Sequence, residues 1–421
     1  MCLAILTPVP EAGAAPPEVI YHNAVVLTME PGRPRAQAIA VRDGRILAVG
    51  DDAGVLALRR GPTRVVDLGG RTVLPGFIDS HAHWIGDGLM VGLTAYSAID
   101  GALRRGWTSI TELFVTQGWL ETLRVLDAAG ELRLRVNAYL PVNFEDEKFG
   151  TWYLAYRPHQ ELGPHLRLAG IKLFLDHDWG TRFHWDQADL NVAVRTAHRN
   201  GWQVAAHTVS AEALDQYLTA VARAAHPGPD ARHRVEHVIQ LRDDQLGRLR
   251  ELGMIASIQP GIPGDLAAEA GFPELVARGR TGWIARWRDL VESGVRTIGG
   301  SDMPWLVLGL GDRAAESPHG SPLDAVHQAV TRQSYLGRPP EDWQLAQRLT
   351  VDQALRLFTI DAAYGTFEEE VKGSLAPGKY ADLVILSADP TTVPVDSLPD
   401  IQVLATVIGG QAQHCADATL C

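Results

Sequence analysis

The fold of this chain is decided by residues 72–84, which read TVLPGFIDSHAHW. A short apolar run ends there in the pattern Asp-Ser-His-Ala-His at residues 79–83. If this run forms a strand, the alternation of its side chains places Asp79, His81 and His83 on one face. Two imidazoles that lie two residues apart on an extended chain can bind one metal ion from the same side. Such a short motif also occurs by chance, so the interpretation depends on further ligands elsewhere in the chain.

The composition is that of an ordinary globular protein. The 421 residues are 46% hydrophobic and 21% charged, which allows one large domain and a smaller one. The net charge of -12 argues against nucleic acid or an anionic membrane surface as the main partner. No apolar run approaches the length of a membrane span.

The two chain ends predict a loose tail and a reducing compartment. Residues 1–18 contain a short apolar patch without a basic flank, so we interpret them as a flexible tail and not as a signal peptide. The three cysteines, Cys2, Cys415 and Cys421, lie near the ends and have no metal-ligand spacing. They suggest no disulfide framework, and we therefore expect a cytoplasmic protein.

The segments that flank the centre of the chain have β character. Residues 19–76 contain runs rich in Val and Ile and a hairpin turn at Asp43-Gly44. This unit is too small to bury much core alone, and the β pattern returns in residues 365–421. We expect the two segments to form one small β-sandwich, into which residues 77–364 are inserted.

The inserted segment has the pattern of a (β/α)8 TIM barrel, because short apolar runs alternate with helical patterns. The expected strands are residues 77–81, 108–114, 132–140, 171–176, 203–207, 233–238, 254–259 and 295–302. A doubly wound open sheet is the rival fold. No glycine-rich phosphate loop follows the first strand, which weakens that rival.

Polar residues stand at the ends of five of these strands. They are His81, His83, Lys172, His207, His237 and Asp302. Each has an ordinary interpretation alone, because a single histidine can be a hydrogen-bonded core residue and Asp302 could cap the next helix. In a barrel, however, the C-terminal strand ends meet at one mouth. Six such residues there favour a common metal site.

The motifs that carry these residues resemble the amidohydrolase superfamily of metal-dependent hydrolases. They are VLPGFIDSHAHW, GIKLFLD, QVAAHTVSAEAL, HRVEH, LGMIASIQP, GGSDMPW and GSLAPGKYADLVIL, and the resemblance covers about residues 20–410. The later motifs are most similar to the family 3 (YtcJ-like) branch. Compared with that branch the chain is shortened between barrel strands one and four, since Lys172 follows His83 by 89 residues (172 − 83).

The resemblance implies a two-metal site. His81, His83 and Asp302 would hold the more buried ion, His207 and His237 would hold the second ion, and an N-carboxylated Lys172 would bridge them. A hydroxide between the metals would attack the substrate, and Asp302 would act as general base and acid. Lys172 and His237 complete the implied catalytic set. Zinc is the expected metal, although manganese, cobalt, nickel and iron suit the same ligands.

The implied activity is hydrolysis of a C–N bond in an amide-like small molecule, such as a cyclic amide, an N-acyl or N-formyl amine, or a carbamate. An ester or lactone hydrolase would use the same apparatus. Deaminase subgroups lack the bridging lysine and carry a glutamate three residues after the strand-five histidine, where this chain has Ser210. We therefore place a deaminase below a hydrolase. A non-catalytic scaffold is a further alternative, disfavoured because all six ligands are present.

The loops after the strands supply candidate substrate-binding residues: Trp84, Trp179, Arg182, Gln259 and Trp305. The tryptophans suggest an apolar or aromatic part of the substrate. Arg182 could pair with a substrate carboxylate or form a surface ion pair. The exposed flanks of the barrel and sandwich are compatible with a homo-oligomer.

Three residues near the expected ligands have supporting roles in this interpretation. His177 stands where many relatives have a glycine-serine stretch, and we expect it in the pocket or beside a ligand. Asp79 lies one step deeper than the two histidines and would support them. Glu236 alternates away from His237, so we expect it to pack against helices or an arginine.

Overall fold

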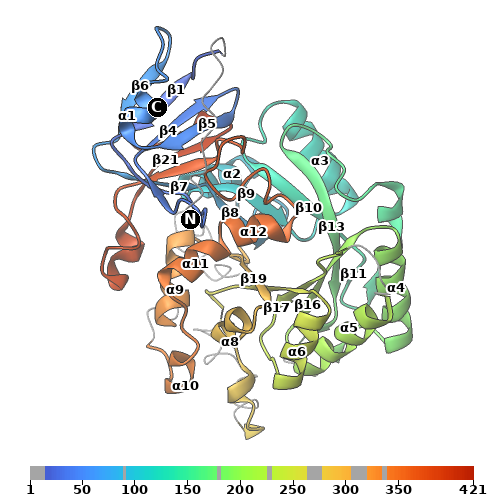
Figure 1. The fold of residues 1–421 in the computed structure, drawn as a ribbon. Helices are drawn as coiled ribbons and strands as arrows, with labels where there is room; N and C mark the ends of the chain where they lie inside the picture. The colour runs from blue at the N-terminus through green and yellow to red at the C-terminus, as the bar shows by residue number, and fades with distance from the viewer. Residues whose placement is uncertain are drawn as a thin grey trace, which may run out of the picture.

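The computed structural model describes residues 15–88, 92–177, 182–224, 230–262, 277–304, 320–333 and 339–421. Eight parallel strands form one sheet in the order β19-β18-β17-β16-β13-β10-β9-β8. Their bounds are β8 (Phe77–Ala82), β9 (Trp107–Glu112), β10 (Arg135–Pro141), β13 (Leu166–Phe174), β16 (Gln203–Thr208), β17 (Arg234–His237), β18 (Ile255–Ile258) and β19 (Arg296–Gly299). The sheet is nearly closed into a barrel, which confirms the predicted fold (Figure 1).

The seam of the barrel lies between β8 and β19, its first and last strands. At the C-terminal end of the seam the Asp302 N–H donates to the carbonyl of His81 at 2.8 Å. The His83 N–H donates to the carbonyl of Met303 at 2.7 Å. These two bonds fix the histidine-bearing strand beside the loop that carries Asp302.

Helices alternate with the barrel strands and lie around the sheet in Figure 1. Their bounds are α2 (Ala95–Arg104), α3 (Gln117–Ala128), α4 (Gln187–Arg199), α5 (Ala211–Ala224), α6 (Asp243–Glu251) and α8 (Trp287–Glu292), followed by α9 (Pro322–Thr331), α10 (Asp342–Leu345), α11 (Val351–Leu357) and α12 (Ile360–Gly365). They are amphipathic: in α4, for example, Leu190, Val194 and Ala197 share the buried face.

Strands from both flanking segments lie together at one end of the molecule (Figure 1). One sheet has the order β5-β4-β1-β6 and the other the order β22-β21-β20-β7-β2-β3. Their bounds are β1 (Val19–His22), β2 (Val25–Leu27), β3 (Arg35–Ala36), β4 (Ala38–Arg42), β5 (Arg45–Gly50), β6 (Arg64–Asp67), β7 (Thr72–Pro75), β20 (Leu383–Leu386), β21 (Val403–Ile408) and β22 (Gln411–Cys415), with the short helix α1 (Asp52–Leu56) after β5. One apolar cluster joins the two sheets. The expected boundaries at residues 76 and 364 stay a prediction.

The expectation of no disulfide is wrong for two of the three cysteines. Cys415 and Cys421 form a disulfide. The Arg64 guanidinium donates to the carbonyls of Leu420 and Cys421 and so holds the last residues beside β6. The two cysteines are six positions apart in the chain, a spacing that the sequence does not mark as a bridge.

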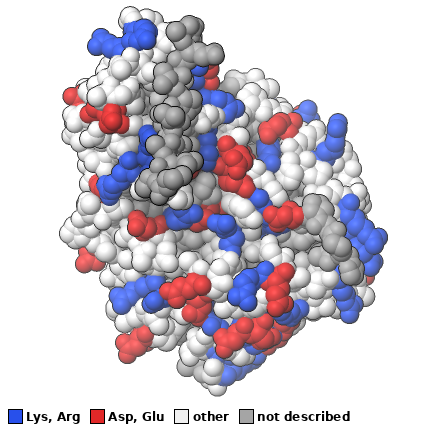
Figure 2. All heavy atoms as spheres, in the orientation of Figure 1, with Lys and Arg blue, Asp and Glu red and all other residues white. Residues whose placement is uncertain are grey.

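The surface carries charges of both signs. On the face shown in Figure 2 the acidic and basic side chains are intermixed. In the part of the chain that the structure describes, every helix is too short or too polar to cross a membrane.

Candidate functional site

A cavity of about 610 Å³ lies at the C-terminal ends of the barrel strands. It is lined by His81, His83, Asp87, Phe114, Phe144, Glu145, Lys172, Phe174, His177, His207, His237 and Asp302. All six residues that the sequence suggests as metal ligands are in this lining. Its volume lies in the ordinary range for a site that binds a small molecule.

The candidate ligands are close to one another in the cavity. Oδ1 of Asp302 lies 3.2 Å from Nε2 of His81 and 3.6 Å from Nε2 of His83. The His237 ring lies between two other imidazoles, with ring centroids 4.6 Å from His81 and 4.5 Å from His207. Ligand atoms of His81, His237 and Asp302 are all within 4.8 Å of one another, so one ion could contact all three.

Burial keeps the four histidines neutral. It lowers the pKa of His83 to about 3. It also lowers the pKa values of His81, His207 and His237 well below the ordinary range, and the positive charge of Lys172 acts in the same direction. A neutral imidazole has a lone pair to donate to a metal, so this electrostatic environment suits metal ligation.

Lys172 is the most unusual residue of the cavity. Its side chain is fully buried, and Nζ has no hydrogen-bond partner among the described residues. Burial lowers its pKa to about 8, although Glu236 and Asp302 oppose the shift. Lys372, the other fully buried lysine, instead donates from Nζ to Glu368 at 2.7 Å and to Ser109 at 2.9 Å. A buried amine without a partner fits a site that gains a further group at Nζ.

Glu236 is part of this site, contrary to the sequence interpretation. Its carboxylate accepts from the Arg234 guanidinium at 2.7 Å, as expected, but it also lies 2.7 Å from Nδ1 of His81. His237 has a φ of 72°, so the strict alternation of β17 ends there and both Glu236 and His237 face the barrel interior. A carboxylate on the far nitrogen of a histidine fixes its tautomer and its orientation.

Asp79 supports the seam beside the histidines. Its carboxylate accepts from the Ser301 N–H at 2.8 Å, from the Ser301 hydroxyl at 2.5 Å and from the Trp84 indole at 3.0 Å. Burial raises the pKa of Asp79 to about 6, while these hydrogen bonds oppose the shift. Asp79 therefore links β8 to the segment that carries Asp302.

The cavity lining does not include the three described residues that we expected to bind substrate. Trp84 is buried and bonded to Asp79. Arg182 pairs with Asp146 at 2.8 Å and with Glu145 at 3.3 Å. Gln259 is buried beside His237, where its hydrogen bond opposes the lowering of the pKa of that imidazole by burial. The other two candidates, Trp179 and Trp305, lie outside the described residues.

Among the described residues, three phenylalanines line the cavity, and the sequence interpretation did not name them as substrate-binding residues. They are Phe114, Phe144 and Phe174. Phe174 could have been found, because it follows Lys172 by two residues on the same strand and therefore shares its face. Phe114 lies in the loop after β9, and Phe144 lies in β11 (Asn143–Phe144), a strand of two residues that is too short for a periodic pattern.

His177 lines the cavity as expected, and a hydrogen-bonded chain holds it. Nδ1 of His177 lies 2.9 Å from Nε2 of His184, whose Nδ1 lies 2.9 Å from Asp146. The Asp146 carboxylate favours a proton on Nδ1 of His184, so Nε2 of His184 accepts from His177. Nε2 of His177 is then the nitrogen without a proton.

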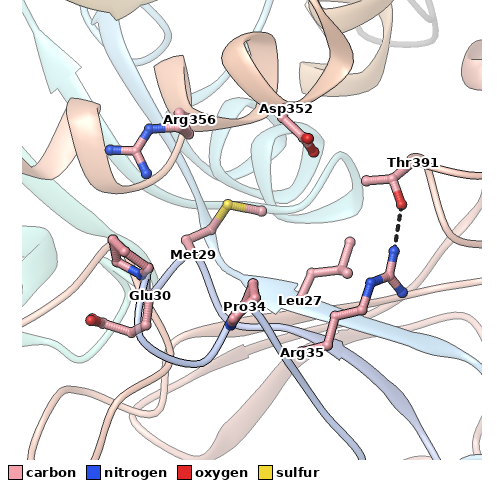
Figure 3. Close-up of a pocket in the computed structure, with 9 residues that line it drawn as sticks. Leu27, Met29, Glu30, Pro34, Arg35, Asp352, Arg356 and Thr391 are labelled. Carbon is pink, nitrogen blue, oxygen red and sulfur yellow. Dashed lines mark hydrogen bonds between the residues drawn. The ribbon is translucent and has the colours of Figure 1, made fainter. Parts of the chain in front are cut away.

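A second cavity, of about 460 Å³, lies where the sandwich meets α11. Figure 3 shows Met29 between Glu30 and Asp352, and Arg35 bonded to Thr391 at 2.7 Å. None of its described lining residues is a histidine or a lysine. The imidazole cluster therefore belongs to the cavity at the barrel mouth.

Comparison with known proteins agrees with this geometry. The model of the amidohydrolase family matches residues 64–105 and 96–413. YtcJ of Bacillus subtilis, named as an amidohydrolase, is 26% identical over 271 residues, which are 59% of this chain and 47% of that protein. The N-substituted formamide deformylase of Arthrobacter pascens is 26% identical over 343 residues, 76% of this chain and 59% of that enzyme. The chain thus spans about half the length of these relatives.

A solved structure of an uncharacterized metal-dependent hydrolase from Pyrococcus horikoshii has the same fold. Its TM-score is 0.72 at 19% sequence identity, and the match covers 90% of this chain and 99% of that chain.

Proposed function

Because the chain belongs to the amidohydrolase family, we propose that it is a metal-dependent hydrolase of a C–N bond in an amide-like small molecule. Cyclic amides, N-acyl or N-formyl amines and carbamates are the candidate substrates. One observation carries the proposal: His81, His83, Lys172, His207, His237 and Asp302 line a single cavity at the barrel mouth.

The residues of this cavity fit a two-metal site. We assign His81, His83 and Asp302 to one ion, His207 and His237 to the other, and an N-carboxylated Lys172 to both. The partnerless Nζ of Lys172 and the neutral imidazoles support this assignment. When bound, such ions polarise a carbonyl and lower the pKa of water to near neutrality. Zinc is our first choice, since it accepts nitrogen and oxygen ligands readily.

The protein residues then have separate tasks. Asp302 takes a proton from the attacking water and delivers it to the leaving nitrogen. Its side chain is 13% exposed and lines the cavity, so substrate can reach it. Glu236 holds His81 in one tautomer through Nδ1. The surrounding burial keeps bulk water away from the reacting groups.

The environment of Ser210 favours a hydrolase over a deaminase. Ser210 is buried, and its hydroxyl accepts from the Ala213 N–H at 3.1 Å at the start of α5. Its own N–H donates to Asp176 at 2.8 Å. It is thus a helix-capping residue that carries no proton to the cavity.

Metal analysis combined with hydrolysis of amide, carbamate and ester chromogens tests the proposal. We expect about two ions per chain, and Lys172→Ala should lose at least one of them. Asp302→Asn should lower kcat by about 10²- to 10⁴-fold, because it removes a proton-transfer group. Lys372→Ala is the matched control, since it removes a buried lysine outside the cavity and should leave the metal content unchanged.

Full activity without metal would overturn the proposed function. A metal-free protein that is inert on every chromogen would favour the scaffold alternative. If the protein hydrolysed only the esters, we would conclude that it cleaves an ester bond and not an amide bond.

A further inference from the structure

Three phenylalanines form one wall of the cavity, which we call the phenylalanine wall (Phe114, Phe144 and Phe174). Every pair of them is in edge-to-face contact, with ring centroids 5.5 Å apart for Phe114 and Phe144, 5.9 Å for Phe114 and Phe174, and 5.3 Å for Phe144 and Phe174. Because all three also line the cavity, they present a continuous aromatic surface to its interior.

The wall adjoins the candidate metal ligands directly. The Phe174 ring stacks on His207 with centroids 5.3 Å apart and an interplanar angle of 26°. Nζ of Lys172 lies 5.0 Å from the centroid of the same ring. A substrate whose reacting group lies between the ligands can therefore place a neighbouring substituent against this wall.

The wall is held in place by the hairpin of β11 (Asn143–Phe144) and β12 (Glu147–Lys148). The Asn143 side chain is fully buried and clamps Phe174: its Nδ2 donates to the Phe174 carbonyl at 2.9 Å, and its Oδ1 accepts from the Phe174 N–H at 3.0 Å. The Trp185 indole donates to the same carbonyl at 3.0 Å. Hydrogen bonds of this kind preorganise a binding surface.

Ordinary core packing does not account for Phe144. It is 40% exposed, and its strand contributes only two residues to the hairpin. An exposed aromatic ring that faces a cavity marks a binding surface, because its apolar area stays in contact with water until a ligand covers it.

The charges around the wall disfavour an acidic substituent. Lys172 is the one Lys or Arg side chain in the described lining of the cavity, and we have assigned it to the metal site. Arg182, which lies near the hairpin, pairs with both Glu145 and Asp146. A carboxylate on the substrate would also meet Glu145 in the lining.

We propose that the substrate carries an uncharged aromatic or branched aliphatic arm beside its amide, and that the phenylalanine wall selects this arm. This inference rests on the proposed function and names its substrate class. In the reaction the amide C–N bond breaks, the water oxygen joins the carbonyl carbon, and the nitrogen gains a proton. The arm takes no part in these changes, so its contact with the wall sets the preference among substrates.

Paired substrates test the inference. The wild-type protein and Phe144→Ala would be assayed with N-methylacetamide and N-benzylacetamide, and with acetamide and phenylacetamide, so that the arm lies on either side of the bond. For the benzyl arm we expect kcat/KM to fall roughly tenfold to a hundredfold in the variant, and for the methyl arm less than threefold. Phe183→Ala is the matched control, because Phe183 is 39% exposed but does not line the cavity.

Binding of benzyl alcohol, measured by calorimetry, separates this inference from the proposed function. Weaker binding to Phe144→Ala than to wild type and Phe183→Ala would support the wall even if no amide were hydrolysed. Equal losses on methyl and benzyl substrates, or equal binding of benzyl alcohol by all three proteins, would overturn the inference. If the wild-type protein hydrolysed none of the amides, only the proposed function would be overturned.

Discussion

At the residue scale, His81 is held through Nδ1, whereas its Nε2 has no hydrogen-bond partner among the described residues. Nδ1 lies 2.7 Å from Glu236 and Nε2 lies 3.2 Å from Asp302. Glu236 and Arg234 are both fully buried, so each charge depends on the other for compensation. Glu236 thus has two tasks that a suitable set of variants can separate, namely the orientation of His81 and the neutralisation of Arg234.

We predict that Glu236→Gln weakens metal binding by about 10- to 100-fold, because His81 loses the carboxylate that orients it. The same change should lower the free energy of unfolding by about 3–5 kcal/mol, because it leaves a buried guanidinium uncompensated. The double variant Arg234→Met/Glu236→Gln removes both charges. It should regain most of the stability but remain weak in metal binding, as measured by chelator competition and urea unfolding. Recovery of metal affinity in the double variant would contradict the orienting role.

The sequence was sufficient to find the ligand candidates but not their supports. His81, Lys172 and His207 follow apolar runs, so the rule that barrel strand ends converge was enough to bring them together. Glu236 shares a face of β17 with Arg234, and the φ of 72° at His237 turns the chain so that the alternation does not extend to His237. The alternation rule assumes an extended backbone, and it therefore placed Glu236 on the wrong side of the strand.

At the element scale, the closure of the barrel depends on Gly300. A Cβ at this position would lie 2.5 Å from both the backbone nitrogen and the Cβ of His81. Two residues later the Asp302 N–H donates to the His81 carbonyl. The close approach that only glycine permits therefore sets the distance between β8 and the loop after β19 that carries Asp302.

We predict that Gly300→Ala separates β19 from β8 and lowers the free energy of unfolding by about 3 kcal/mol, because the new methyl group meets backbone atoms that cannot rotate away. Activity and metal binding should fall with it. Gly282→Ala is the control, since a Cβ there would meet nothing within 4 Å. Urea unfolding midpoints measure the effect. Equal midpoints for both variants would show that the seam tolerates the extra volume.

The regular elements could be predicted, whereas the short ones could not. Each of the eight barrel strands has a run of apolar and β-branched residues, and the expected runs overlap all eight observed strands. The β11–β12 hairpin has only two residues in each strand, and tertiary hydrogen bonds from Asn143 hold it. Contacts between residues that are distant in sequence leave no local pattern, so the phenylalanine wall stayed hidden.

At the scale of the whole molecule, an ion pair joins the barrel to the sheets beside it. Arg135 at the start of β10 donates from Nε and Nη2 to Asp382 at 2.7 and 3.1 Å. The two residues are 247 positions apart, and their side chains are only 13% and 5% exposed. The return of the β pattern near the C-terminus could predict the shared sheet, but composition gave no reason to pair these two residues.

We predict that Asp382→Asn lowers the free energy of unfolding by about 3 kcal/mol, because it leaves the largely buried Arg135 guanidinium without its counter-charge. The Asn oxygen can still accept from the Gly409 N–H, which donates to Asp382 at 2.8 Å, so the variant tests the charge more than the hydrogen bond. Glu292→Ala, which breaks the exposed pair with Arg288, should cost much less, because solvent screens that pair. Urea unfolding, followed by tryptophan fluorescence, measures both.

The pair of Arg135 and Asp382 lies at the opposite end of the barrel strands from the cavity, so metal content should not change in either variant. If Asp382→Asn were no more destabilising than Glu292→Ala, packing of the apolar side chains alone would hold the barrel against the sheets.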